Sequence, residues 1–505
     1  MKWTSDTAAC DVIVVGGGGS GLAAAAEAAR LGRSVILLEK NAALGGSTAW
    51  SVGSISATGT PHQKAKGIVD HPDAHFEDLE VLAGSMANRD NRALRRLLVD
   101  NTTEMLAWLE SVGLVFVGPN PEPPHRLPRM HNVLPNSRAF PEMLGRHCRS
   151  LGVDMRLQTL ADSLLLDGGR VVGVRTKGPA GASDLHCRGG VVLAGGDYSA
   201  SREMKASLAG PATAELEAVN PHATGDAIRI ALAAGAEVVN GDIVRGPIMR
   251  FVPPTRPSLL RRLPPRRWLA LSMRWASEHL PQSIQRRMAM SFLTTALGPS
   301  RGLFEAGAIL VNADGRRFCD ELGQPAPTVP EQPGRLAYIV MDSAIAAKFT
   351  GWPNFISTAP GIAYAYLDDY RRNRADIFHE AESVAGLAGS LGVPAEALAR
   401  TMADTADPTA SDGKPRPPIA KPPFIALGPI KSYVVFTDGG LRVTERLEVV
   451  GPAGQPIPGL YAAGSTGQGG LLLEGHGHHL GWAFISGRIA GRHAALDVAA
   501  RLPPV

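Results

Sequence analysis

The sequence contains little cysteine. Only Cys10, Cys148, Cys187 and Cys319 occur among its 505 residues, and they lie far apart along the chain. None of them has the close spacing of a Cys-x-x-Cys motif, a haem-attachment site or a zinc ribbon. This spacing excludes those classes of site, and we predict no metal ligand.

The sequence also lacks a long apolar run. A helix that crosses a bilayer needs about 18 or more apolar residues in succession, and no such stretch occurs. The beginning of the chain does not resemble a secretory signal, because no basic segment precedes its apolar stretch and four glycines interrupt that stretch. We therefore predict a cytoplasmic protein.

Neither sign of charge is in large excess, since 51 Lys and Arg stand against 47 Asp and Glu, a formal net charge of +4. The basic residues gather in one segment, residues 256–287. Its arginines are Arg256, Arg261, Arg262, Arg266, Arg267, Arg274, Arg286 and Arg287, against one acid, Glu278. Because the positive charge is local, we predict no nucleic-acid partner.

Trp268 and Trp275 lie among these arginines, and the segment 256–287 has two interpretations. An amphipathic helix of this composition is attracted to anionic lipid, which predicts a possible peripheral membrane contact. The alternative is an exposed helix of a lid domain.

Glycine, in contrast, is abundant. The chain has 57 glycines and 39 prolines, more than the usual share of about 7% and 5%. Hydrophobic residues make up 44% and charged residues 19%, which is typical of a folded globular protein. Its length corresponds to about three domains, and its many tight turns favour a fold that surrounds a ligand.

The first glycine cluster lies between a strand and a helix. The stretch Asp11–Glu39 reads as a buried strand, a glycine-rich turn, an alanine-rich helix and a second strand. Gly16 permits a sharp turn, Gly18 lets the backbone approach a pyrophosphate, and Gly21 allows close packing of helix and sheet. The helix N-terminus attracts phosphate, and Glu39 is placed to accept hydrogen bonds from a ribose diol. The stretch therefore predicts dinucleotide binding.

Other segments predict further elements of an α/β fold. Val153–Val174 alternates like two paired strands around a turn at Asp167–Gly169. Gly459–Gly464 reads as a strand that leads through a glycine-rich turn to a helix from Leu480 to about Val498. We interpret residues 119–138 as a solvated loop that carries the titratable residues His125, Arg126, Arg129, His131 and Arg138.

Four blocks of the chain together carry a family resemblance. They are Val14–Gly21, Gly45–Gly53, Gly195–Gly196 with Thr224–Asp226, and Gly459–Gly464 with the last helix. In this order they resemble the fumarate reductase and 3-ketosteroid dehydrogenase flavoprotein superfamily, over nearly the whole chain. The resemblance implies an α/β fold with an α+β cap: a doubly wound, Rossmann-like FAD-binding domain interrupted by a smaller mobile cap domain.

The resemblance also implies a domain division and a cofactor. The FAD-binding domain would comprise residues 1–239 and 376–505, and the cap residues 240–375. FAD would be bound without a covalent bond, because Ser47, Thr48 and Trp50 occupy the segment where some members carry the attachment histidine. The residues expected to contact FAD are Gly16, Gly18, Gly19, Ser20, Gly21, Glu39, Lys40, Gly45, Gly46, Ser47, Thr48, Ser51, Gly53, Gly195, Gly196, Asp226, Gly464, Ser465, Glu474, Gly477, His479 and Leu480.

Departures from the family pattern bear on the substrate. Dicarboxylate reductases resemble one another in a His-His-Thr-Met-Gly-Gly run and two arginines, one after the cap's Asn-Glu hairpin and one in the last glycine-rich turn. This chain has Val435–Gly440, Asp320–Pro325 and Glu474 at those places. Because a dicarboxylate is held by charge-assisted contacts, we do not expect fumarate or succinate as substrate.

The ketosteroid dehydrogenase branch is more similar. Gly439–Arg442 and the spacing of Gly475, Gly477 and Gly481 match it, although Phe424 stands in Pro422–Ala426 where that branch has its catalytic tyrosine. The resemblance implies an FAD-dependent oxidoreductase that removes two hydrogens from adjacent carbons next to the carbonyl of a hydrophobic cyclic ketone or steroid-like substrate, with hydride passing to flavin N5.

Three alternatives remain open. One is an ene-reductase that runs the same half-reactions backwards, another is a non-catalytic flavoprotein, and the third docks segment 256–287 on a membrane for quinone reduction. The electron acceptor is a quinone, a soluble carrier or oxygen.

A proton donor or acceptor is also needed. The candidates are Tyr433, Tyr364, Tyr366, His131 and His478. We interpret His476, His478 and His479 as residues along the isoalloxazine edge and not as a metal cluster.

Overall fold

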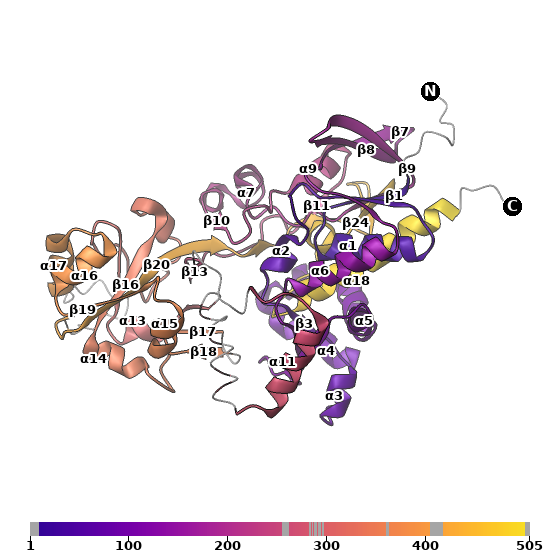
Figure 1. Ribbon diagram of the computed structural model, residues 1–505. Helices are drawn as coiled ribbons and strands as arrows, with labels where there is room; N and C mark the ends of the chain where they lie inside the picture. Colours follow the sequence, from indigo (N-terminus) through magenta and orange to yellow (C-terminus); the bar gives the residue numbers. More distant parts are fainter. Residues whose placement is uncertain are drawn as a thin grey trace.

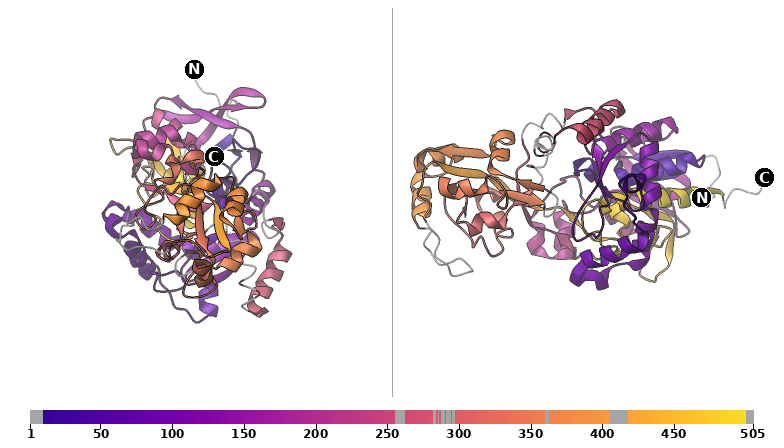
Figure 2. Two further views of the ribbon diagram at one scale, coloured as in Figure 1. Left: turned by 90° about the vertical axis from the view of Figure 1, so that its left-hand side faces the viewer. Right: turned by 90° about the horizontal axis from the view of Figure 1, so that it is seen from below.

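The computed structural model describes residues 10–254, 262–281, 297–359, 363–404 and 418–499, together with Ile284, Arg286, Met290 and Thr294. The chain forms two bodies joined by a narrower connection (Figures 1 and 2). Both ends of the chain, drawn in indigo, magenta and yellow, build the larger body, and its middle, drawn in salmon and orange, builds the smaller one (Figure 1).

A largely parallel sheet forms the centre of the larger body. Its strand order is β23-β24-β9-β1-β2-β6, and all neighbours except β23 and β24 are parallel. An antiparallel hairpin, β7 and β8, continues from β9. The strands are β1 (Cys10–Val15), β2 (Val35–Leu38), β6 (Asp154–Arg156), β7 (Leu160–Asp167), β8 (Arg170–Gly178), β9 (Gly181–Leu193), β23 (Glu448–Val450) and β24 (Pro456–Ala462).

The sequence explains why the first unit folds as it does. Every residue of β1 and β2 is buried, as expected for parallel strands covered on both faces. Between them lies α1 (Gly19–Arg30), whose alanines are good helix formers and small enough for close packing. The predicted strand, turn, helix and strand are confirmed, as is the hairpin at Asp167–Gly169.

The final helix packs closely on α1. This helix, α18 (His478–Ala499), approaches so closely that a Cβ added at Gly487 or Gly491 would lie 2.3 or 2.2 Å from a carbonyl oxygen of α1. The helix predicted at Leu480–Val498 is thus confirmed. Around it lie α4 (Pro72–Ala83), α5 (Arg92–Ser111), α6 (Ala139–Ser150) and a small sheet of β3 (Ser54–Ser56), β4 (Val115–Asn120) and β5 (Met130–Leu134) (Figure 1).

The smaller body has its own sheet and its own hydrophobic core. The order β10-β20-β16-β15 is extended by β13 and β19, both paired with the long strand β20. Its strands are β10 (Glu217–Ala218), β13 (Ile248–Phe251), β15 (Ile309–Val311), β16 (Ala337–Asp342), β19 (Phe378–Ala381) and β20 (Phe424–Val434), and its helices include α13 (Arg301–Glu305), α14 (Ser343–Ala346), α15 (Leu367–Asn373), α16 (Val384–Leu391) and α17 (Ala395–Ala403).

The core of the smaller body reaches further along the chain than residue 375, where the sequence analysis ends the cap. It extends from Phe251 to Ile430, because β19 and β20 pair with each other and β20 also pairs with β16. Two short strand pairs lead between the bodies: β12 (Val244–Arg245) with β21 (Phe436–Thr437), and β11 (Val238–Val239) with β22 (Gly440–Leu441).

Residues 119–138 differ from the solvated loop of the sequence analysis. Arg129 is 1% exposed and forms ion pairs with Asp70 and Asp78, at 2.7 and 2.5 Å. His125 and His131 are buried as well. A buried guanidinium needs charged partners, and the two aspartates lie about fifty residues earlier, so the local pattern did not indicate burial.

The remaining helix of note, α11 (Arg267–His279), lies in the basic segment and packs against β4 of the larger body. Residues 255–261 of that segment, with Arg256 and Arg261, and also Arg287, lie outside the described residues. Within the described part of the chain, every helix is too short or too polar to cross a membrane.

Candidate active site

A cavity of about 1480 Å³ lies at the junction of the two bodies. Single small-ligand pockets measure roughly 300 to 1000 Å³, so this cavity has room for a long ligand and a second molecule. Its lining comes from the larger body at one end, with α1 and α2 (Gly46–Trp50), and from the smaller body at the other, with β13 and β20.

Glycines shape the first end of the cavity. A Cβ added at Gly196 would meet no atom within 4 Å, and one at Gly18 or Gly46 would meet its first neighbour only at 3.8 or 3.7 Å. All three line the cavity, so side chains there would occupy ligand space. They form a cradle beside the N-terminus of α1, whose N–H groups and dipole favour phosphate.

Glu39 closes this end of the cavity. Its Oε2 accepts a hydrogen bond from the N–H of Gly17 at 2.7 Å, and its Oε1 accepts two from Asn41 at 2.8 Å. The carboxylate is buried but lines the cavity. It is therefore held in one orientation by the backbone, and its remaining lone pairs can accept from a ribose diol.

Charged and polar side chains fix the segments around the cradle. Lys40 pairs with Asp226 at 2.7 Å, joining the end of β2 to the start of α9 (Asp226–Ala233). Burial raises the pKa of Asp226, but hydrogen bonds from Lys40 and Thr224 outweigh it and lower the pKa on balance. Asn220 donates to Ser47 Oγ at 2.8 Å.

Most of the predicted FAD-contacting residues line this cavity. They are Gly16, Gly18, Gly19, Ser20, Glu39, Lys40, Gly46, Ser47, Thr48, Ser51, Gly195, Gly196, Asp226, Gly464, Ser465, Glu474, Gly477, His479 and Leu480. Gly21, Gly45 and Gly53 lie behind it. A Cβ at Gly21 would be 1.8 Å from the carbonyl oxygen of Gly16, which is the close packing of helix and sheet that the sequence predicts.

Tyr433 and Arg250 face the other end of the cavity. Antiparallel pairing places Tyr433 of β20 opposite Ile248 of β13, and Arg250 lies two residues further on the same face. All three line the cavity. Burial raises the pKa of Tyr433 to about 12, with Glu217 adding to the rise and Arg250 opposing it. At neutral pH the phenol is therefore a hydrogen-bond donor.

Arg250 has no carboxylate partner among the described residues, and its buried Nε has no hydrogen-bond partner. Burial lowers its pKa. A guanidinium stays charged at neutral pH even so, and a partly buried charge without a counter-ion is unfavourable. The structure thus presents a cation and a phenol to whatever occupies this end of the cavity.

Arg245, in contrast, is neutralised. Its Nε donates to Asp438 at 2.6 Å, and a second nitrogen pairs with Glu474. Burial raises the pKa values of both carboxyl groups, and Arg245 opposes that rise. Because two acids surround one base, this part of the lining does not attract a carboxylate.

Of the five predicted catalytic residues, the cavity lining contains Tyr433 alone. Tyr364 packs against Trp352 and Phe355, and the ring of Tyr366 lies under Arg286. His131 is buried beside Thr60 Oγ1 at 3.1 Å. His478 lies next to two other histidines, away from the lining.

Sequence reasoning missed Arg250 and Arg245, which come from short strands at the start of the smaller body. It also missed the inner face of α11, where Met273, Ala276 and Leu280 line the cavity. Their spacing of three and four residues is the helical signal that could have identified this face. No local motif marks the two arginines, because strand pairing brings them to the site.

Known proteins are similar to this chain over most of its length. The chain matches the FAD binding domain family over residues 11–257 and 275–472. It is 26% identical over 502 residues to a probable fumarate reductase of Shewanella frigidimarina, covering 96% of this chain and 74% of that protein. It is also 26% identical to the vinyl phenol reductase of Lactiplantibacillus plantarum, covering 96% of each.

Solved structures show the same fold. The open conformation of a flavocytochrome c3 fumarate reductase has a TM-score of 0.73 at 23% identity, covering 99% of this chain and 82% of that one. The 3-ketosteroid-Δ4-(5α)-dehydrogenase of Rhodococcus jostii RHA1 has a TM-score of 0.59 at 25% identity, covering 96% of each chain. The predicted superfamily and α/β fold are confirmed. The chain belongs to the FAD binding domain family and is an FAD-dependent oxidoreductase that acts on carbon–carbon bonds.

Proposed function

We propose that the protein interconverts CH–CH and C=C next to the carbonyl of a hydrophobic cyclic ketone or steroid-like substrate. One observation supports this proposal most. Arg250 and Tyr433, two hydrogen-bond donors, line the end of the cavity opposite the glycine cradle, and no carboxylate of the described residues pairs with Arg250. The surrounding lining includes Phe251, Met273 and Phe436. Such a surface fits an apolar molecule with one polar end.

In this proposal the cavity-lining residues of the glycine cradle would hold FAD without a covalent bond, and the bound cofactor would supply hydride transfer. The carbonyl oxygen of the substrate accepts hydrogen bonds from Tyr433 and Arg250. Loss of a hydride from the β-carbon to the bound cofactor and of a proton from the α-carbon to solvent water would leave the C=C bond, and the reverse reaction would return both. Donors at the carbonyl oxygen stabilise the enolate charge in either direction.

Reduction of the C=C bond suits the protonation state of Tyr433. Its raised pKa keeps the phenol protonated, so it can donate a hydrogen bond or a proton but is a poor base at neutral pH. As a hydrogen-bond donor to the carbonyl oxygen Tyr433 acts in both directions, whereas ene-reduction is the direction in which it can also supply a proton.

A monocarboxylate conjugated to the C=C bond is the second candidate. Arg250 supports it, because a carboxylate would compensate its partly buried, unpaired charge. A dicarboxylate has less support, since Arg245 already pairs with Asp438 and Glu474. Relatives of this chain are named as reductases of fumarate, vinyl phenol and urocanate.

For the electron acceptor we propose access through α11. Trp268 and Trp275 are 67% and 61% exposed on its outer face, opposite the face that lines the cavity. An exposed apolar and basic helix over the cavity fits contact with an anionic membrane that carries a quinone. Sedimentation with anionic liposomes, lost when both tryptophans become alanine, would support this contact, and unchanged sedimentation would contradict it.

The proposed reaction is tested by anaerobic visible spectroscopy of the flavin-loaded protein. Bleaching by a cyclic or steroid-like ketone at equimolar concentration supports dehydrogenation, with succinate as the matched dicarboxylate control. Reoxidation of the dithionite-reduced protein by an enone supports the reductase direction. If neither ketones nor enones changed the flavin absorbance, the proposal would be contradicted.

A further inference from the structure

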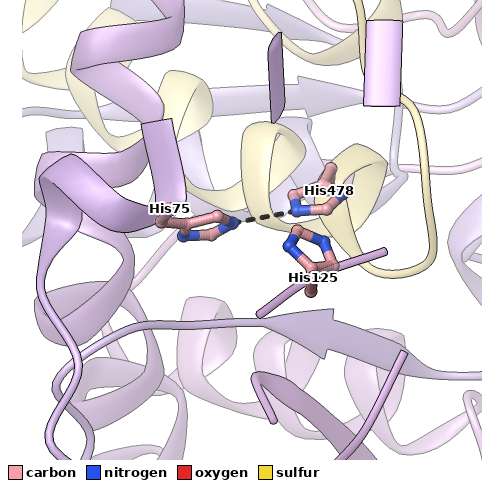
Figure 3. A group of neighbouring side chains, drawn as sticks. All are labelled: His75, His125 and His478. Carbon is pink, nitrogen blue, oxygen red and sulfur yellow. Dashed lines mark hydrogen bonds between the residues drawn. The ribbon is translucent and has the colours of Figure 1, made fainter. Parts of the chain in front are cut away.

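Three buried histidines from distant parts of the chain meet beside the cavity. His75 lies on α4, His125 in the segment between β4 and β5, and His478 is the first residue of α18 (Figure 3). The His75 and His478 residues are 0% exposed, and the side chain of His125 is 1% exposed. We call these three residues the histidine cluster.

The three rings converge on one small space. Each ring offers one nitrogen, and these three atoms lie within 4.8 Å of one another. Nε2 of His75 is 3.0 Å from Nε2 of His478 (Figure 3). Zinc–nitrogen bonds of about 2.1 Å place ligand atoms about 3.4 Å apart in a tetrahedral site. To reach that geometry the widest pair in the cluster would close by at most about 1.4 Å, and the His75–His478 pair would open by about 0.4 Å.

The protein alone does not satisfy the cluster. A hydrogen bond between His75 and His478 uses one nitrogen of each ring, and His75 Nδ1 contacts Thr58 Oγ1 at 2.7 Å. His125 Nδ1 contacts Arg129 at 3.1 Å. This leaves His125 Nε2 buried without a hydrogen-bond partner among the described residues. Buried polar atoms are rarely left in this state.

The surroundings suit a divalent cation. Burial lowers the pKa values of all three histidines, and the Arg129 guanidinium lowers those of His75 and His125 further. The rings are therefore neutral imidazoles, the form that binds metal, beside one fixed positive charge that Asp70 and Asp78 neutralise.

Asp78 Oδ2 lies 3.6 Å from His125 Nδ1, and Arg129 lies between them, since it pairs with Asp78 and donates to His125 Nδ1. For His125 to bind metal through Nε2, the Nδ1 atom would have to carry the proton and donate to Asp78 in place of accepting from Arg129. Glu122 also faces His125 and His478, and its Oε2 is buried without a hydrogen bond.

We propose that His75, His125 and His478 bind one zinc ion, whose remaining position is open to water or to the carboxylate of Glu122. Imidazole nitrogen is a preferred zinc ligand, and a three-histidine set is a known zinc geometry. This set differs from the run His476, His478 and His479, which the sequence analysis weighed as a metal cluster.

The site has a structural consequence for the cavity. The ion would join α4 and the segment before β5 to the beginning of α18. Gly477 and Leu480, on either side of His478, line the cavity. Zinc would thereby fix the turn that leads into the cofactor cavity, and this inference does not depend on the identity of the substrate.

The test is metal analysis of the full-length, flavin-loaded protein. After chelator treatment and addition of equimolar zinc, mass spectrometry of the desalted protein is expected to find one zinc per chain. X-ray absorption at the zinc edge is expected to show imidazole nitrogens at about 2.0–2.1 Å. Added zinc should also raise the melting temperature, because a ligand that binds the native state stabilises it.

Two variants and a matched control complete the design. His75→Gln and His125→Gln should each weaken zinc binding at least tenfold while the flavin spectrum shows that the protein is folded. His131→Gln changes another buried histidine outside the cluster and should leave zinc binding unchanged. Failure to retain zinc in the parent protein, or equal retention in the cluster variants, would overturn the proposal and leave the hydrogen-bonded arrangement as the complete account.

Discussion

The two ends of the cavity are built by different means. The cofactor end is formed by backbone and glycine, with Gly18, Gly46 and Gly196 leaving space that side chains would fill. The other end, where we propose that the substrate binds, is formed by side chains of the smaller body, above all Arg250 and Tyr433. The comparison teaches that cofactor binding depends on positions without a side chain, which leave room for the ligand. Substrate choice depends on the chemistry of particular side chains.

The largest expected effect is at the cofactor end. In Gly21→Ala the new Cβ would lie 1.8 Å from the carbonyl oxygen of Gly16, and backbone cannot yield as a flexible side chain does. We expect a loss of about 3 kcal/mol of stability and little bound flavin, measured by denaturant unfolding and the absorbance of the purified protein. Gly389→Ala in α16 is the control, because the added Cβ would have no atom within 4 Å. This variant should keep the stability and the flavin content of the parent protein.

At the substrate end, Tyr433→Phe removes one hydroxyl. We expect the rate of enone reduction to fall by about 10² to 10³, the usual cost of removing one hydrogen-bond donor from a developing oxyanion, while flavin content stays constant. Single-turnover reoxidation of the reduced protein measures this rate. Tyr364→Phe, outside the cavity, is the matched control, and an equal loss in both variants would contradict the role of Tyr433.

Arg250→Met separates the two substrate candidates. A lost charged hydrogen bond costs about 1.5–3 kcal/mol, so binding of a monocarboxylate should weaken by roughly ten- to a hundredfold, and binding of a neutral ketone less. Because the guanidinium lacks a counter-ion, the variant should be as stable as the parent or more stable. Titration of the flavin spectrum and thermal melting check the two expectations, and clear destabilisation would show that Arg250 has a structural role.

The smallest expected effect is a pH dependence. Since the pKa of Tyr433 is raised from 10.0 to about 12, its phenol stays protonated throughout the range in which the protein is handled. The kcat/KM of enone reduction should therefore remain flat from neutral pH to about 10.5. A fall that begins near pH 9 and disappears in Tyr433→Phe would mean that the phenol has an ordinary pKa.

The sequence predicted one end of the cavity better than the other, for a physical reason. The turn from Gly16 to Gly21, Glu39 and the last helix depend on contacts within short segments, so the motif itself indicates the geometry. Arg250 and Tyr433 are about 180 residues apart, and their proximity depends on the pairing of β13 with β20. No periodicity in one sequence reveals such a pairing.

The histidine cluster and the end of the smaller body illustrate the same limit. His75, His125 and His478 come from three separated segments, and no spacing rule joins them. The hydrophobic core of the smaller body continues to Ile430 because β20 pairs with strands of a sheet whose first members lie more than 100 residues earlier in the chain. Long-range contacts decided both features, whereas the hairpin at Asp167–Gly169 was predictable from its turn residues.

The most direct test of the account is a single turnover of the reduced, flavin-loaded protein with one equivalent of a cyclic enone in the absence of oxygen. The account predicts that the absorbance of oxidised flavin returns and that one equivalent of saturated ketone is formed, much more slowly in Tyr433→Phe. Reoxidation by fumarate but not by the enone would contradict it.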